Sequence, residues 1–185
     1  SIKLDATPAG LPLYRKLGFN EEYSLYRMTN TSFSITPECN LDNCEKINKT
    51  NISNILQSDR VIFGSDRSVL LSYLLENKPE SSYTISRNGK TEAYIFGRTG
   101  MKYSYLGPAC GVTADAVKEI VAQVLFANSG GPMALDIHED KNDFIRWLEG
   151  YGFQIQRSFT RMYLKSNKYP GKPELQYLIS GPEFG

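Results

Sequence analysis

The chain has 185 residues, of which 41% are hydrophobic and 22% are charged, and its formal net charge at pH 7 is +1. This composition is ordinary for a globular protein, and the length allows one domain with a substantial core, or one domain and a piece of another. The near-zero charge gives no electrostatic reason to expect binding to nucleic acid or to a membrane surface. The first residues do not resemble a secretion signal, and no apolar run approaches the length that spans a bilayer.

The chain contains three cysteines and a single histidine. This set is too small for a disulfide scaffold, and its spacing does not match a four-ligand zinc site. We therefore expect no metal site and a reducing, cytoplasmic setting. The first residue is not methionine, which suggests a fragment of a longer protein.

Residues 1–28 predict a strand, a helix and a second strand. Leu13, Tyr14 and Leu17 share one face of the short helix, and Gly18 stands where a helix ends in the left-handed conformation. One helix and two strands cannot cover their own apolar faces. We therefore expect this segment to pack on the rest of the chain, on a second copy in a homodimer, or on a missing upstream half, which is the preferred explanation.

Residues 29–43 are polar and rich in turn-forming residues, which indicates a linker. The pattern beyond them predicts a short strand at 44–47 and then two helices. The first helix is expected to end near Arg60, and the second at Lys78-Pro79.

Alternating apolar and polar residues predict antiparallel strands in the middle of the chain. Residues 82–87 and 91–97 flank Asn88-Gly89, which is a strong hairpin signal. The remaining predicted elements are a strand at 102–106 that ends at Gly107-Pro108, a long helix from Thr113 or Asp115, a buried strand at Met133–Ile137, a helix and strand reaching Leu164, and a last strand at Leu175–Ile179.

The chain repeats its beginning near its end. LDATPAGLPLYRKLGF and the strand after it align with LDIHEDKNDFIRWLEGYGF and the strand after that. The repeated arginines, Arg27 and Arg161, are expected to bind a structural partner such as a buried carboxylate rather than to act in catalysis. The identities are Gly18, Phe19, Ser24, Arg27 and Met28, which match Gly152, Phe153, Ser158, Arg161 and Met162.

The segment ATPAGLPLYRKLGF resembles the C-terminal half of the GNAT N-acetyltransferase fold, in which a strand leads to a helix carrying a Tyr, then Gly-Phe and a long strand. The region from LGPACGVTADAV through FTRMY to ISGPEFG resembles the second domain of tandem GNAT proteins. The resemblance implies an α/β (α+β) fold with a mixed, mostly antiparallel, twisted sheet and helices on both faces. It implies that 1–28 end a first GNAT domain, that 29–43 link the domains, and that 44–185 form a complete but degenerate second GNAT-like domain.

The resemblance also implies transfer of an acetyl group from acetyl-CoA, as co-substrate, to a primary amine. In GNAT enzymes the pyrophosphate binds backbone N–H groups at a helix start, through a loop of the form Gln/Arg-x-x-Gly-x-Gly/Ala. The matching segment LGPACGV lacks the Gln/Arg, and Pro108 removes a donor. Ala109, Cys110 and Gly111 are therefore weak candidates for cofactor binding, and a plain strand-to-helix connection is the better interpretation.

The position of the family's general acid, which protonates the leaving sulfur, is occupied by Tyr14, four residues before Gly18. The second copy has Leu148 at this position, which cannot donate a proton. We therefore predict that Tyr14 is catalytic, on condition that an upstream domain completes the first one. The alternative is a half-buried aromatic residue on an amphipathic helix.

His138, Glu139 and Asp140 cluster where a predicted strand meets a helix. Ligands of open α/β sheets bind near the carboxyl ends of strands, so His138 and Glu139 are candidates for binding the acceptor amine. Alternatively, the carboxylates only complement the helix dipole. The sequence thus predicts an acetyltransferase whose catalytic domain lies largely upstream; the alternative is a non-catalytic GNAT-like module for acceptor binding or dimerisation.

Overall fold

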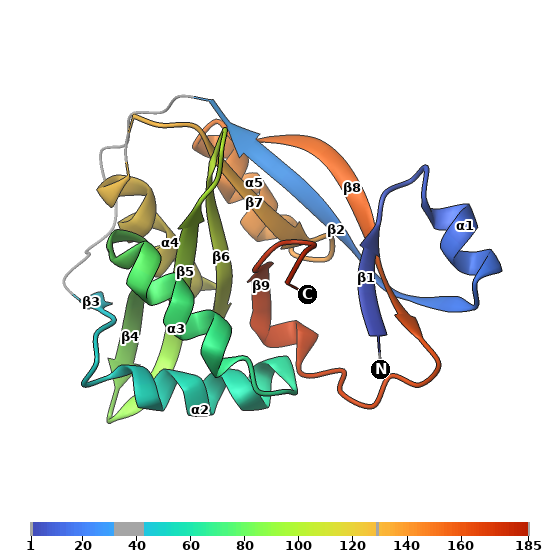
Figure 1. The fold of residues 1–185 in the computed structure, drawn as a ribbon. Coiled ribbons are helices and arrows are strands. Elements are labelled where there is room, and N and C mark those ends of the chain that lie inside the picture. Colours follow the sequence, from blue (N-terminus) through green and yellow to red (C-terminus); the bar gives the residue numbers. More distant parts are fainter. Residues whose placement is uncertain (1, 32–42, 129, 185) are drawn as a thin grey trace.

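The computed structural model describes residues 2–31, 43–128 and 130–184, which build a nine-stranded sheet with helices against both faces (Figure 1). The strand order is β1-β8-β2-β7-β9-β6-β5-β4-β3, and every pair is antiparallel except β6 with β7. The predicted fold class is confirmed. The strands are β1 (Ile2–Ala6), β2 (Phe19–Asn30), β3 (Glu45–Lys46), β4 (Tyr83–Arg87), β5 (Lys90–Thr99), β6 (Ser104–Gly111), β7 (Met133–His138), β8 (Gln154–Leu164) and β9 (Gln176–Ile179); the helices are α1 (Leu11–Lys16), α2 (Ile52–Phe63), α3 (Ser68–Asn77), α4 (Ala114–Ala127) and α5 (Asn142–Gly150).

The core is divided by the sheet into two apolar layers, because successive side chains of a strand point to opposite faces. On β5, Tyr94 and Phe96 belong to the layer formed with α2 and α3. Their neighbours Ala93 and Ile95 belong to the layer formed with α4 and α5. The alternating pattern that predicts the strands therefore also assigns helices to each face.

Local sequence signals explain where several helices begin and end. The Thr113 hydroxyl accepts a hydrogen bond from the backbone N–H of Ala116, 3.2 Å away, and so caps the start of α4. The helix α2 ends at Phe63, three residues beyond the predicted end at Arg60, and Gly64 caps it with a φ of 89°. Gly18 and Gly152 follow α1 and α5 at φ values of 86° and 82°, as the repeat predicts.

The two copies of the repeat form an interleaved, pseudo-symmetric pair. β1 and β2 come from the first copy, β7 and β8 come from the second, and the four strands lie in the order β1-β8-β2-β7. Leu4 lies opposite Met162, and the corresponding Leu135 lies opposite Met28. Leu25 pairs with Phe159, its own counterpart in the other copy. A pseudo-twofold axis therefore passes through this pair.

The repeated arginines each bind a carboxylate from the other copy. Arg27 donates from Nε and Nη2 to the two oxygens of Asp136, at 2.7 and 2.8 Å. Arg161 makes the same two-pronged contact with Asp5. The expectation of a buried carboxylate partner is confirmed, and these two ion pairs connect the first copy to the second.

Residues 2–30 thus pack on their own chain, which is one of the arrangements expected for them. β2 continues to Asn30, so the predicted linker begins two residues too early. The rest of that linker, 32–42, and Cys39 within it lie outside the described residues. The predicted strand at 102–106 is also wrong at its end, because β6 runs on to Gly111. Within the described ranges, no helix is both long and apolar enough to cross a bilayer.

Candidate functional site

The two parallel strands β6 and β7 diverge in the centre of the sheet. Residues 104–106 of β6 pair with residues 133–135 of β7, and β9 then enters between the two strands. Leu178 pairs with Ala109 on one side and with Ile137 on the other. The strand edges that such a divergence would offer to an extended ligand are therefore occupied by the chain's own β9, as Figure 1 shows.

The weak candidates for cofactor binding, Ala109, Cys110 and Gly111, lie in β6 and not in a connection to α4. All three are buried, and they pair with β5. Burial raises the pKa of the Cys110 thiol to about 12, so it is protonated at neutral pH and is not a nucleophile. The expected connection is wrong because β9 and β5 supply partners on both edges of this stretch, which holds it extended through Pro108.

The start of α4 is the other place where a phosphate could bind. A pocket of about 320 Å³ lies beside it and is lined by Asp140 and Asp143, and Asp115 is in the first turn of the helix. The Lys141 ammonium donates to the carbonyl oxygen of Glu174 at 3.0 Å, which commits part of its donor capacity. The three carboxylates around the start of this helix would repel a negatively charged pyrophosphate, so the residues here do not fit acetyl-CoA.

A pocket of about 450 Å³ gathers the candidate acceptor residues at the carboxyl end of β7. His138 and Glu139 line it, as the sequence predicts, together with Asp140. Tyr23 and Tyr26 of β2 also line it, and the sequence reasoning missed both. They arrive because β2 runs antiparallel to β7, with Leu25 opposite His138.

The pocket presents acidic and neutral acceptor groups. Glu139 accepts a hydrogen bond from the Tyr26 hydroxyl at 2.8 Å, and this bond raises the pKa of Tyr26. His138 is 3% exposed and stacks against Tyr23 with ring centroids 4.4 Å apart. Burial lowers the pKa of His138 to about 4, so the imidazole is neutral at pH 7. Its Nε2 has no hydrogen-bond partner among the described residues.

This arrangement suits a cationic group better than an anionic one. The carboxylates of Glu139 and Asp140 attract an ammonium, and Asp140 also lies 3.8 Å from the ammonium of Lys141. A protonated imidazole would repel the same group, so the low pKa of His138 keeps the pocket receptive at neutral pH.

Tyr14 lies on α1, in the other half of the pseudo-symmetric pair, and does not line this pocket. Its ring is half-buried and meets Phe19 edge to face, with centroids 5.6 Å apart. The aligned Leu148 of α5 is fully buried in the core. The structure therefore separates the predicted acid from the predicted acceptor residues.

Comparisons with known proteins agree with the fold. A family profile described as acetyltransferase (GNAT) domain matches residues 55–178. The chain is 27% identical over 153 residues to the uncharacterized N-acetyltransferase YitH of Bacillus subtilis (strain 168), covering 83% of this chain and 54% of that protein. A putative acetyltransferase from Pyrococcus horikoshii superposes with a TM-score of 0.77 at 21% identity, covering 100% of this chain and 59% of that one. A putative GNAT acetyltransferase from Novosphingobium aromaticivorans gives 0.59 at 15% identity, covering 80% and 69%. The chain thus spans less than two thirds of the first two relatives.

Proposed function

Because this chain belongs to the GNAT acetyltransferase family, we propose that the whole protein transfers an acetyl group from acetyl-CoA to a primary amine. The observation that supports placing donor binding elsewhere in the protein is the position of β9, which fills the space between the diverging strands β6 and β7. Acetyl-CoA has an extended, amide-containing arm that needs free strand edges, and this domain has none at that position. We therefore assign donor binding to a first domain that ends with residues 1–28.

The exposed parts of the first copy support this division. In the second copy, Phe144, Ile145 and Leu148 of α5 are buried against the sheet. The helix α1 has no buried residue; its Leu13 is 57% exposed, and Leu17, which follows the helix, is 59% exposed. β1 also lies at the edge of the sheet. An apolar helix face beside an open strand edge is where the layers of a further domain would pack.

Tyr14 acts as the general acid in this proposal. The amine attacks the thioester carbonyl, the new C–N bond forms, and the C–S bond breaks. Tyr14 donates its hydroxyl proton to the departing sulfur, and the proton lost by the amine passes to solvent. The pocket of His138 and Glu139, which Tyr14 does not line, takes no part in this step.

The experiment replaces Tyr14 by Phe in the whole protein. General acid catalysis contributes roughly 10²- to 10⁴-fold, so we expect turnover to fall by about 100-fold or more while acetyl-CoA binding stays the same. Tyr73→Phe, which removes a hydroxyl from an exposed tyrosine of α3, is the matched control. Turnover of Tyr14→Phe equal to that of the control would remove the assignment.

A second candidate is a non-catalytic module for acceptor binding or dimerisation. The same occupied divergence between β6 and β7 favours it, because a domain without a donor site performs no transfer alone. The two candidates differ in the whole protein: an acetyl acceptor would be consumed in the first case and only bound in the second. Product formation from acetyl-CoA and an amine, followed by mass spectrometry, distinguishes them.

A further inference from the structure

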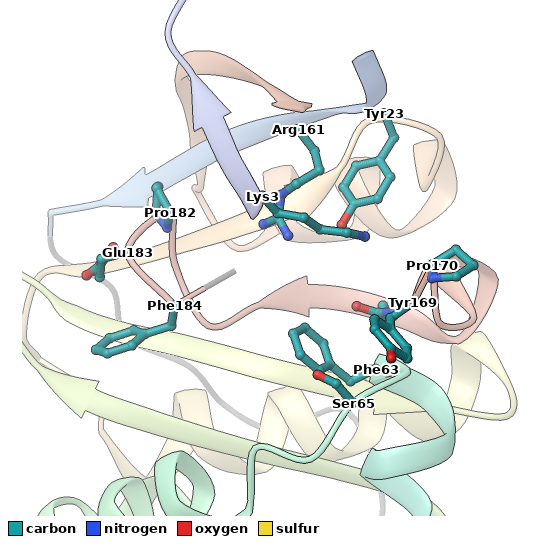
Figure 2. A pocket seen from close by; sticks show the side chains of 11 residues that line it. Lys3, Tyr23, Phe63, Ser65, Arg161, Tyr169, Pro170, Pro182, Glu183 and Phe184 are labelled. Carbon is teal, nitrogen blue, oxygen red and sulfur yellow. The ribbon is translucent and has the colours of Figure 1, made fainter. Parts of the chain in front are cut away.

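A second pocket, of about 300 Å³, lies on the other side of Tyr23. Its upper wall is formed by side chains of β1, β2 and β8, namely Lys3, Tyr23 and Arg161 (Figure 2). The opposite wall is aromatic and comes from the end of α2, the loop after β8 and the C-terminal turn, with Phe63, Tyr169 and Phe184. A cavity of this size is large enough for a small organic ligand.

The upper wall offers hydrogen-bond donors that the fold does not use. Arg161 is 2% exposed and spends Nε and Nη2 on Asp5, while its Nη1 has no hydrogen-bond partner among the described residues. Burial raises the pKa of Tyr23 to about 12, so its hydroxyl keeps its proton, and it too makes no hydrogen bond within the described part of the chain. Figure 2 shows both groups directed toward the cavity beside Lys3.

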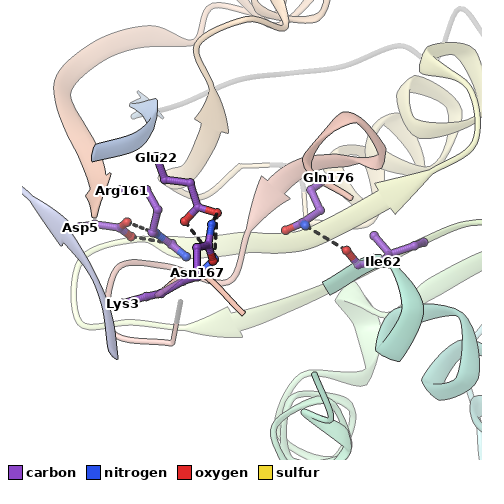
Figure 3. A network of polar contacts seen from close by, with 7 residues as sticks. All are labelled: Lys3, Asp5, Glu22, Ile62, Arg161, Asn167 and Gln176. Atoms are coloured by element: carbon purple, nitrogen blue, oxygen red, sulfur yellow. Dashed lines mark hydrogen bonds and ion pairs between the residues drawn. The ribbon is translucent and has the colours of Figure 1, made fainter. Parts of the chain in front are cut away.

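Lys3 completes this donor set. Its ammonium donates to Glu22 Oε1 at 2.9 Å and lies 2.9 Å from Oε2, and Asn167 donates to Oε1 at 2.8 Å (Figure 3). Lys3 is therefore held in place with at least one N–H left over. Glu183 also lines the pocket, but its carboxylate is paired with Arg98. Each charge is locally balanced. Donors of Arg161, Tyr23 and Lys3 remain unused within the described residues, and so do two buried acceptors, Glu22 Oε2 and Asn167 Oδ1.

The pseudo-symmetric arginine has the same hydrogen bonds but different surroundings. Arg27 makes the same two-pronged contact with its aspartate, but its guanidinium lies between the rings of Tyr105 and Phe159, 5.3 Å from each centroid. Among the described residues, a single aromatic ring lies over the Arg161 guanidinium, that of Tyr23 at 5.6 Å. The pocket lies beside Arg161, where Arg27 has a second ring.

We propose that this pocket binds a small molecule that joins a carboxylate to an aromatic or apolar body. The carboxylate accepts hydrogen bonds from Arg161 Nη1, the Tyr23 hydroxyl and the Lys3 ammonium, and the body packs between Phe63, Tyr169 and Phe184. A carboxylate suits the site because charge-assisted hydrogen bonds from arginine and lysine are the strong ones. The proposal does not depend on acetyl transfer, since this pocket and the acidic pocket of Glu139 lie on opposite sides of Tyr23.

The test is calorimetric titration of the chain with 3-phenylpropionate and with its neutral isostere 3-phenylpropanamide, up to about 10 mM, because fragments of this size bind near about 1 mM. We expect the acid to bind at least about tenfold more tightly than the amide.

Tyr23→Phe and Lys3→Met should each weaken the binding of the acid by about tenfold, and Tyr73→Phe should not change it. Thermal unfolding verifies that each variant is folded; if Tyr23→Phe is not, the acid–amide comparison and Lys3→Met still decide. Equal binding of acid and amide, no binding of the acid, or an unchanged affinity in the folded variants would overturn the proposal.

Discussion

Arg27 and Arg161 occupy equivalent positions of the repeat, but their surroundings differ, and so do their roles. Both are buried, and both hold an aspartate of the opposite copy. Arg27 is closed in by aromatic rings, so its contribution is structural. Arg161 performs the same structural task with two nitrogens and presents the third to a pocket.

The pair of Arg27 and Asp136 allows the first prediction. Replacing Arg27 by Met leaves the Asp136 carboxylate, whose side chain is 1% exposed, buried without its partner. We expect the free energy of unfolding to fall by about 3–5 kcal/mol, and expect Arg27→Met combined with Asp136→Leu to recover most of it. Urea unfolding measures both. A single variant as stable as the wild type would refute a structural role for the pair.

The lowered pKa of His138 predicts a pH dependence of stability. The unfolded chain takes up the proton near the ordinary value of 6.5, and the folded chain only near about 4. The unfolded state therefore binds more protons between these values, and stability falls as pH drops through that window. Relative to His138→Gln, the wild type should lose about 2 kcal/mol between pH 7 and pH 5. Because the chain has a single histidine, an NMR titration of its imidazole checks the pKa directly; a value near 6.5 would contradict the account.

At the scale of elements, α1 and α5 descend from the same repeat but are packed differently. Leu148 of α5 is 0% exposed in the core, whereas the aligned Tyr14 of α1 is only half-buried. α1 lies apart from the other helices in Figure 1. The same motif is thus a core element in one copy and a surface element in the other, as far as this chain extends.

This contrast predicts unequal costs for equivalent substitutions. Leu148→Ala removes buried methyl groups and should lower the free energy of unfolding by about 2–5 kcal/mol. Tyr14→Ala in the 185-residue chain should cost less than about 1 kcal/mol, because the side chain has one aromatic neighbour and much solvent around it. Chemical denaturation of the two variants in parallel makes the comparison, and equal losses would show that α1 is packed as tightly as α5.

The elements themselves follow from the sequence, but one of their positions does not. Period and turn signals predict most of the strands and helices, because they depend on residues close together in the chain. The position of β9 is set by the strand edges that are open where β6 and β7 diverge. The sequence of a four-residue strand does not indicate which edges it will pair with. For the same reason Pro108 was expected to end a strand that in fact continues to Gly111.

At the scale of the whole molecule, the sheet joins the two halves without a break, and the candidate sites lie where they meet. His138 and Glu139 are adjacent in sequence, so a cluster was visible there. Tyr23 and Tyr26 could be added only by knowing that β2 pairs with β7, and the carboxylate pocket draws on both ends of the chain. The repeat is the sequence signal for this long-range pairing. It predicts that the two halves have similar local structure, but it does not predict that their strands interleave.

The central claim is that the described part of this chain holds no site for acetyl-CoA, because β9 occupies the strand edges and carboxylates surround the start of α4. Calorimetric titration of the 185-residue chain with acetyl-CoA tests it most directly, with the whole protein as the positive control. We predict no binding tighter than about 1 mM to the chain and clear binding to the whole protein. Micromolar binding to the 185-residue chain would contradict the account and would place the donor site within this chain.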